Sequence, residues 1–307
     1  MFKSLFFCNF VAHYSLGIIL CLTLGVFAEH TSLMKIGVFD SGYGGLTILE
    51  KMRLRLPQYD YIYLGDNART PYGTRSFDII RQYTWECVNY LFDSGCELVI
   101  LACNTASAKA LRSIQQNELI HRWEEDGSNR KRVLGVIRPT VEALLNDDAR
   151  HIGVLATPGT IASESYVIEI NKLLPTARVT QQPCPMWVPM IEAGEYKTEG
   201  ARWFIKKYVS DLLDRDPQIS SIILGCTHYP IIYRQIRNIV PENIRLIEQG
   251  EIVALSLSDY LLRHKELADC LSQGDTCRYL TTEQPDKFSS SATIFLRQPI
   301  NAEHARI

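Results

Sequence analysis

Two stretches of sequence, ELVILACNTAS (97–107) and SIILGCTHYP (221–230), decide the fold class of this chain. In each stretch, an apolar run of strand length leads through a small residue to a cysteine, Cys103 or Cys226. Apolar runs of this length are typical of strands that are buried on both faces of a parallel sheet. The two stretches therefore predict two buried strands, each with a cysteine at its carboxyl end.

The same pattern extends along the chain from Met34 onward. Helical candidates lie at residues 77–91 and 201–213, and the charged segment 124–131 with its Gly-Ser-Asn core is expected to be a loop or a domain boundary. Alternating strands and helices indicate an α/β fold with mostly parallel sheets. The other strand-like runs are IGVF (36–39), YIYL (61–64), VLGVI (133–137) and IGVLA (152–156).

Two pairs of similar segments indicate an internal duplication. IGVFDSGYG begins at Ile36 and IGVLATPGT at Ile152, 116 residues later, while Cys226 follows Cys103 by 123 residues. A duplicated α/β half would give two similar domains, with the cysteines at equivalent strand ends on the two sides of a cleft. Chance similarity between buried strands is the alternative explanation for either pair.

Composition and charge narrow the classes of partner. The chain has 307 residues, of which 46% are hydrophobic, so it can bury the core of about two domains. Its formal net charge of -2 and its lack of a Lys/Arg block give no reason to expect nucleic acid or a membrane surface as a partner. Nine cysteines, an odd number without a C-x-x-C pair, predict reduced thiols and no metal site.

The N-terminal segment 1–33 resembles an export signal. Lys3 is followed by an uncharged, largely apolar stretch (4–28), and Ala28 stands where a signal peptidase could cut. Met34 opens the first clear strand, however, as a natural start codon would. Because a thiol enzyme gains nothing from an oxidising compartment, we expect a wrongly assigned upstream start and a cytoplasmic protein, with export as the alternative.

Both cysteines precede helical candidates. Asn104 and Thr105 are possible caps after Cys103, and Thr227 is one after Cys226. Because a helix N-terminus stabilises negative charge, we expect the pKa of each thiol to lie below its free value of about 8.5. Packing in the core is the alternative role for either cysteine alone.

Two thiols on opposite walls of a cleft are suited to removing a proton from one face of a carbon and returning one to the other face. Each thiol must then act as acid and as base, which is the chemistry of racemisation or epimerisation. The developing carbanion requires nearby hydrogen-bond donors and a site from which water is excluded. Asn104, Thr105, Thr227 and the backbone N–H groups of the two helix starts are candidate donors.

Four motifs resemble the motif blocks of the glutamate racemases, in that family's order: DSGYGG (40–45), PYG (71–73), ACNTAS (102–107) and GCTHYP (225–230). The similarity runs from Met34 to about Leu296 and includes the segment RYLTTEQPDKF. Variants of the two cysteine motifs also occur in aspartate and hydantoin racemases, so the first two motifs carry the assignment of substrate.

The resemblance implies roles for individual residues. Cys103 and Cys226 would be the two proton donors and acceptors, with Asp40 assisting at Cys103, and with Glu192 and His228 as polar partners of Cys226. Structural roles are the alternatives: Asp40 would cap a turn, Tyr72 would pack in the core, and His228 would form a hydrogen bond at a helix start. The residues implied to bind substrate are Asp40, Ser41, Tyr72, Gly73, Asn104, Thr105, Thr227 and His228.

The resemblance also implies an organisation and a setting. We expect a first domain over residues 34–130, completed by 240–296, a second domain over 131–239 and a C-terminal tail over 297–307. No pyridoxal phosphate or metal is expected, glutamate is the expected substrate, and D-glutamate would enter peptidoglycan synthesis in a bacterial cytoplasm. A homodimer is compatible with the sequence. Arg138, where many family members have an acidic residue, is expected to alter the surface between the domains.

Three other functions are compatible with parts of the pattern. A racemase of another acidic amino acid, such as aspartate, would have the same motifs around its cysteines. A cysteine hydrolase or amidase would use Cys226 with His228, but residues two apart at a helix start seldom orient as a nucleophile and its base, and Cys103 would have no role. A binding protein that closes on an acidic amino acid would not need either thiol.

Overall fold

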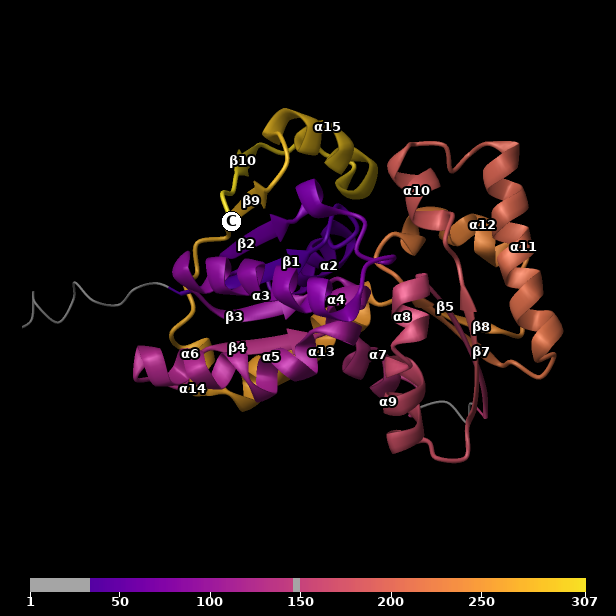
Figure 1. The fold of residues 1–307 in the computed structure, drawn as a ribbon, viewed down its shortest axis with the longest axis horizontal. Helices are drawn as coiled ribbons and strands as arrows, with labels where there is room; N and C mark the ends of the chain where they lie inside the picture. The colour runs from indigo at the N-terminus through magenta and orange to yellow at the C-terminus, as the bar shows by residue number, and fades with distance from the viewer. Residues whose placement is uncertain (1–33, 146–149) are drawn as a thin grey trace, which may run out of the picture.

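In the computed structural model, which describes residues 34–145 and 150–307, ten strands form two sheets that lie in two lobes (Figure 1). All neighbouring strands in both sheets are parallel. The first sheet has the order β10 (Ala302–His304), β9 (Cys277–Thr281), β2 (Tyr61–Gly65), β1 (Lys35–Asp40), β3 (Cys96–Leu101), β4 (Arg132–Gly135). The second has the order β6 (Arg178–Pro183), β5 (His151–Ala156), β7 (Ser221–Gly225), β8 (Arg245–Ile247). The signal-like segment 1–33 lies outside the described residues.

The second sheet repeats the central part of the first. In each sheet the first strand along the chain lies between the second and the third, and the fourth flanks the third. Val38 of β1 is paired with Ile100 of β3, and Val154 of β5 with Ile223 of β7. These pairs are related by the spacings of 116 and 123 residues seen in the sequence. The two similar α/β halves are confirmed, and Cys103 and Cys226 follow equivalent strands.

Helices cover both faces of each sheet. Those of the first lobe are α2 (Leu46–Arg55), α3 (Phe77–Asp93), α4 (Asn104–Lys109), α5 (Leu111–Gln116), α6 (Glu118–Asp126), α7 (Ile137–Glu142), α13 (Gly250–Arg263), α14 (Lys265–Ala268) and α15 (Pro285–Leu296), with the 3₁₀ helix η1 (Asn67–Arg69). Those of the second lobe are α8 (Pro158–Ala162), α9 (Ser165–Leu173), α10 (Trp187–Glu192), α11 (Glu199–Arg215) and α12 (Tyr233–Arg237), with the 3₁₀ helix η2 (Tyr229–Ile232). Among these described helices, none has the length and apolar character needed to span a membrane.

Successive side chains of a strand point to opposite faces of the sheet, and each face packs against its own layer of helices. On β1, Ile36 and Val38 pack with α2 and α13, whereas Phe39 points to the other face and packs with α3. In the second lobe, Leu155 packs with α11, and Val154 packs with α9 on the opposite face. Because both faces are covered, each central strand contains an apolar run of four or five residues, which is why these strands are recognisable in the sequence.

The chain crosses between the lobes twice. It leaves the first lobe after β4 through α7, and it returns after β8 into α13, which packs against α2. These crossings differ from the expected boundaries at residues 131 and 240, because β4 pairs with β3 in the first sheet and β8 pairs with β7 in the second. The segment 297–307, expected to be a tail, contains the edge strand β10.

The six strands expected from apolar runs are confirmed, each beginning within one residue of the expected position. The segment 124–131 is partly helical, contrary to the expectation of a loop or domain boundary. Helix α6 continues to Asp126 and ends at Gly127, whose φ of 60° is the left-handed conformation that favours glycine at a helix C-terminus. Only residues 128–131 form a loop, and it leads into β4 within the first lobe.

Removing β10 should destabilise the first lobe. Deletion of residues 302–307 removes the pairing of β10 with β9, the bond from Ala305 N to Thr281 O (2.8 Å) and the buried Ala305 side chain. At about 1 kcal/mol for each hydrogen bond, the free energy of unfolding should fall by about 2 kcal/mol or more in urea titrations. Deletion of Ile307 alone, which is 45% exposed, is the control. Equal stability of the two truncated proteins would show that β10 does not contribute.

Candidate active site

The carboxyl ends of three central strands bring the motif residues together. Asp40 is the last residue of β1, Cys103 follows β3 with one residue between them, and Cys226 directly follows β7. Ligands bind at this end of parallel sheets, where the loops after neighbouring strands meet. Helices α4 and α8, which begin just after such strand ends in the two lobes, are in contact at the boundary between the lobes (Figure 1).

The loop after β1 lies directly against the loop after β7. A Cβ atom on Gly44 would lie 2.2 Å from Thr227 Oγ1 and 2.4 Å from His228 Nδ1, so no side chain fits at this position. Thr227 Oγ1 also donates a hydrogen bond to Asp40 Oδ1 (3.4 Å), and the Thr47 hydroxyl donates to the Thr227 carbonyl (3.0 Å). The first motif of one lobe is therefore in contact with the last motif of the other.

Cys103 is the N-cap residue of α4, a position that had been expected for Asn104 or Thr105. Its sulfur accepts a hydrogen bond from Ala106 N (3.5 Å) and lies 3.4 Å from Ser41 Oγ. The cysteine is only 6% exposed, and burial together with the nearby Asp40 carboxylate raises the pKa of Cys103 to about 12. The expectation of a lowered pKa is wrong for this thiol, since loss of solvation outweighs the helix N-terminus.

Burial also raises the pKa of Asp40 above its ordinary value. The side chain is fully buried, and this loss of solvation outweighs the stabilisation of its carboxylate by His228 and by the backbone N–H groups of Gly42 and Gly45. Gly42 N donates to Asp40 Oδ2 at 2.9 Å. Asp40 can therefore hold a proton at a higher pH than an exposed aspartate does.

Cys226 is part of a chain of three side chains. His228 Nδ1 lies 3.8 Å from Cys226 Sγ, and His228 Nε2 lies 2.9 Å from Glu192 Oε1, at the end of α10. Burial lowers the pKa of His228, but its bonds to Cys226 and Glu192 have the larger combined effect and hold this pKa well above its ordinary value. Residues 226 and 228 thus face each other, contrary to the expectation from their spacing. The helix expected after Cys226 begins as the 3₁₀ turn η2, which gives this part of the chain a tighter path.

A cluster of hydroxyl groups lies beside α4. Thr105 Oγ1 is 3.0 Å from Thr157 Oγ1 and 3.3 Å from Thr160 Oγ1, and all three side chains are buried. Gly73 packs against Thr157, since a Cβ atom on Gly73 would lie 3.2 Å from Thr157 Cβ. Thr157 and Thr160 were not predicted, although the 116-residue repeat aligns Thr157 with Ser41 and could have identified it.

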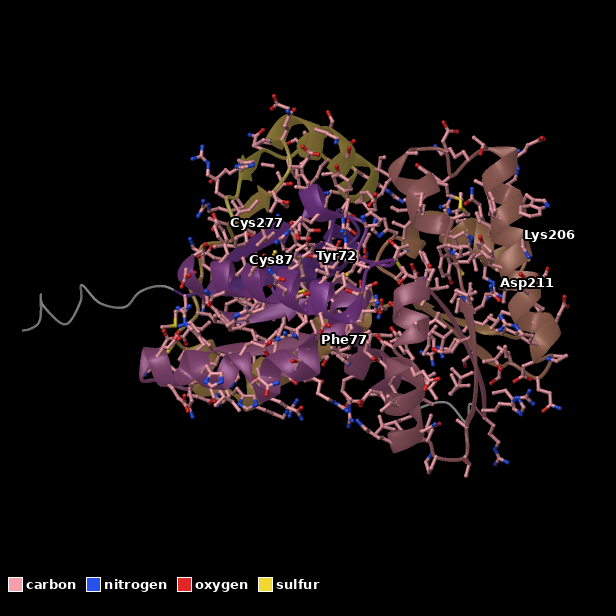
Figure 2. All side chains as sticks on the ribbon, in the orientation of Figure 1. Tyr72, Phe77, Cys87, Lys206, Asp211 and Cys277 are labelled. Carbon is pink, nitrogen blue, oxygen red and sulfur yellow. The ribbon has the colours of Figure 1, made fainter. Side chains whose placement is uncertain are left out.

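Two predicted substrate-binding side chains are bonded to protein groups. The Tyr72 hydroxyl donates to Asp66 Oδ2 (2.5 Å) inside the first lobe, where Tyr72 lies near Cys87 (Figure 2). The Asn104 amide donates to Gln249 Oε1 (2.6 Å) and accepts from the Tyr166 hydroxyl (2.7 Å). Packing is thus the observed role of the Tyr72 ring, and its part in binding substrate stays a prediction, as does that of Asn104.

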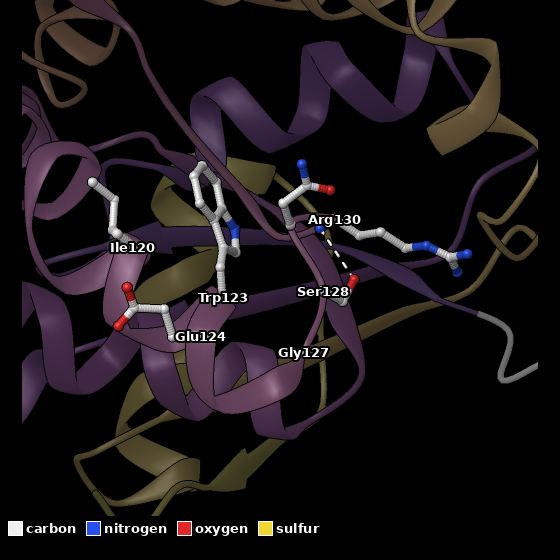
Figure 3. A pocket seen from close by; sticks show the side chains of 7 residues that line it. Ile120, Trp123, Glu124, Gly127, Ser128 and Arg130 are labelled. Carbon is white, nitrogen blue, oxygen red and sulfur yellow. Dashed lines mark hydrogen bonds between the residues drawn. The ribbon is translucent and has the colours of Figure 1, made fainter.

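Other features of the surface lie apart from these motifs. A hollow beside α6 is lined by Trp123 and its neighbours, and Arg130 N donates to Ser128 Oγ within it (Figure 3). None of the motif residues lines this hollow. Over residues 34–145 and 150–307, no three His, Cys, Asp or Glu side chains are grouped so that they could hold a metal ion. The seven cysteines in these ranges are all free.

Comparison with known proteins identifies similar sequences and structures. A family model described as Asp/Glu/Hydantoin racemase matches residues 45–256. The glutamate racemase of Paracoccus denitrificans (strain Pd 1222) is 41% identical over 283 residues, which cover 89% of this chain and all of that protein. The structure of glutamate racemase isoform RacE1 from Bacillus anthracis superposes with a TM-score of 0.79 at 30% identity, covering 89% of this chain and 98% of that one. Glutamate racemase from Francisella tularensis, solved in complex with D-glutamate, has a TM-score of 0.76 at 34% identity, with 90% and 97% covered.

The charge of His228 should depend on Glu192. We expect the ring protons of His228 to titrate in NMR spectra well above the ordinary pKa of about 6.5, and Glu192→Gln to lower this pKa. Because the folded state holds this proton more tightly, the stability it adds is present below about pH 6.5 and is lost as pH rises through the folded-state pKa. Glu195→Gln removes the same charge from an exposed residue three positions later. Equal titration of His228 in the two variants would contradict the assignment.

Proposed function

This chain belongs to the Asp/Glu/hydantoin racemase family and, within it, to the glutamate racemases, and from this premise we propose that Cys103 and Cys226 move the α-proton of glutamate. One thiol serves each face of the α-carbon, and the two exchange roles with the direction of reaction. The chain is an amino-acid racemase by its family, whereas the assignment of the two thiols is the proposal.

The equivalence of the two cysteine positions carries this proposal. Each sulfur follows the same strand of its own sheet, and each has separate polar partners, Ser41 and Asp40 for Cys103, and His228 with Glu192 for Cys226. The Cys226–His228–Glu192 chain alone would also suit a cysteine hydrolase. A hydrolase would leave Cys103 without a role, and the family of the chain does not support it.

Proton transfer begins at Cys226 for one enantiomer. The cationic His228 faces this sulfur and favours negative charge on it, so the sulfur can take the α-proton, forming an S–H bond while the electron pair of the C–H bond stays on the α-carbon. Cys103, whose raised pKa keeps it protonated, then gives its proton to the opposite face and becomes a thiolate. The low exposure of both sulfurs supports a site from which water is excluded, as a carbanion requires.

The other enantiomer requires that Cys103 first loses its proton. Asp40 is the group that can receive it, because its own raised pKa makes it a stronger base than an exposed carboxylate. Cationic His228 gives Cys226 a proton, so that after Cys103 has taken the α-proton from the substrate, Cys226 delivers its proton to the other face. The two directions thus use different auxiliary groups, Asp40 for one and His228 with Glu192 for the other.

The hydroxyl cluster and the family support glutamate as the substrate. Thr105, Thr157 and Thr160 offer hydrogen-bond donors for a carboxylate at the boundary between the lobes. The Francisella tularensis relative binds D-glutamate, and the other relatives named above are glutamate racemases. Aspartate, the alternative substrate, is not favoured by these relatives.

We infer that the D-glutamate produced enters peptidoglycan synthesis and that the enzyme works in the cytoplasm, where thiols stay reduced. The similarity to glutamate racemases supports this role, since D-glutamate is a component of peptidoglycan. Cells depleted of the protein should stop growing unless D-glutamate is added to the medium, and L-glutamate should not replace it. Continued growth of depleted cells without D-glutamate, with no second racemase present, would contradict this role.

Replacing either thiol should stop racemisation without preventing binding. A serine hydroxyl is too weak an acid to replace a thiol, so Cys103→Ser and Cys226→Ser should each lower kcat by about 10²–10⁴-fold. Each variant keeps the other thiol. It should therefore still remove the α-proton from one enantiomer of a β-chloro amino acid, whose chloride then leaves. The two variants should act on opposite enantiomers, which chloride release from the D and L analogues measures.

Cys184→Ser is the matched control, since Cys184 is also a buried cysteine of the second lobe but is not part of the cysteine motifs. All variants are compared at equal folded fraction, measured by circular dichroism. The two-thiol assignment is wrong if folded Cys103→Ser racemises glutamate at nearly the parent rate, or if both variants eliminate from the same enantiomer.

A further inference from the structure

A buried glutamine lies where the chain returns from the second lobe to the first. Gln249 is separated from β8 only by Glu248, directly precedes α13 and is 3% exposed. Its side-chain nitrogen Nε2 donates towards Thr140 Oγ1 (2.9 Å), Tyr166 OH (3.0 Å) and Asn104 Oδ1 (3.2 Å). Its oxygen accepts from Asn104 Nδ2 (2.6 Å). All polar atoms of this amide are therefore bonded to groups from three other segments.

These partners come from both crossings and from both lobes. Thr140 belongs to α7, through which the chain first leaves the first lobe, and Tyr166 belongs to α9 of the second lobe. The Tyr166 hydroxyl donates to Asn104 Oδ1 (2.7 Å), which closes the network. We call Asn104, Thr140, Tyr166 and Gln249 the hinge cluster, because they join both crossings to α4.

The hinge cluster touches the residue next to each sulfur. Asn104 directly follows Cys103. Gly225 directly precedes Cys226, and a Cβ atom there would lie 3.1 Å from Tyr166 Cε2, so the tyrosine ring packs against the backbone at this point. A single side chain, Tyr166, therefore contacts both cysteine segments, one through its hydroxyl and the other through its ring.

The exposed pairs around the same helices are weaker constraints. Arg138, also on α7, donates a hydrogen bond to Glu142 (2.7 Å) and another to Glu169 of α9 (3.3 Å). The bond to Glu169 joins Arg138 to the second lobe. Its side chain is 51% exposed, and exposed ion pairs contribute little. In the hinge cluster every member is buried and bonded, so any other arrangement would leave polar groups unpaired at a substantial cost.

We propose that the hinge cluster sets the spacing between the Cys103 and Cys226 sulfurs, with Gln249 and Tyr166 as positioning residues. This inference rests on the proposed two-thiol reaction. When the cluster is loosened, the thiol near the substrate still removes the α-proton, but the opposite thiol delivers its proton less often. The carbanion is then more often reprotonated by the first thiol, after that thiol has exchanged with solvent.

The experiment follows L-glutamate and D-glutamate by mass and chirality in deuterated water at low conversion. In the parent enzyme the product should carry one solvent deuteron at the α-carbon, and the recovered substrate almost none. Tyr166→Phe, which keeps the ring but removes the hydroxyl, should lower kcat about tenfold with little change in KM, since small misplacements of reacting groups are costly. It should also raise the ratio of deuterium in recovered substrate to product formed. Gln249→Met should lower kcat further and raise this deuterium ratio further.

Tyr61→Phe is the matched control. Tyr61 is as buried as Tyr166, and its hydroxyl bonds the Leu56 carbonyl (3.0 Å) inside the first lobe, away from the crossings. Loss of this hydroxyl group should reduce the stability of the protein without changing the deuterium ratio. If Gln249→Met does not fold, the deuterium ratio of Tyr166→Phe alone tests the positioning role of the hinge cluster.

The outcomes separate the two proposals. Equal deuterium ratios in Tyr166→Phe, Tyr61→Phe and the parent would overturn the positioning role and leave the two-thiol reaction standing. Deuterium appearing in the recovered substrate of the parent as fast as in its product would instead contradict the two-thiol reaction itself. A raised ratio in Tyr166→Phe but not in Tyr61→Phe supports the positioning role.

Discussion

The close approach of the Gly44 backbone to Thr227 and His228 is the contact on which the site depends. It brings the loop after β1 of one lobe against the loop after β7 of the other, so that Asp40 and Thr227 can bond across the boundary. A side chain at position 44 would separate these loops. The two sulfurs are held on the two sides of this boundary because each follows the equivalent strand of a duplicated sheet.

The two halves are similar in backbone but different in electrostatics. Cys103 lies with a buried carboxyl group, and burial with that charge raises its pKa to about 12. Cys226 lies with a histidine that Glu192 helps to keep protonated. The duplication therefore supplies matching positions, while the groups around each sulfur differ: a carboxyl and a hydroxyl group lie near Cys103, and an imidazole ring faces Cys226. In the proposed reaction one thiol begins as the base and the other as the acid, and different surroundings for the two sulfurs suit this division.

Much of the fold could be predicted because the central strands are buried on both faces and therefore contain continuous apolar runs. Four strands, β6, β8, β9 and β10, were missed, since RVTQQP, RLI, CRYLT and AEH are short or polar and lack a long apolar run. Three of them, β6, β8 and β10, are edge strands. The motif residues Asp40, Ser41, Thr227 and His228 do lie together with the cysteines. The raised pKa of Cys103 could not be predicted, because the sequence reveals a helix start but not the loss of solvent around it. Nor could Gln249 or Tyr166, which have no motif and meet only in three dimensions.

The central claim is that the two thiols lie on opposite faces of the substrate's α-carbon. A crystal structure of this chain with bound D-glutamate tests it most directly. We predict that the α-carbon lies between the Cys103 and Cys226 sulfurs, about 3.5 Å from each, with its hydrogen directed at one of them. A complex in which both sulfurs lie on the same side of the α-carbon, or in which one is turned away from it, would contradict the account.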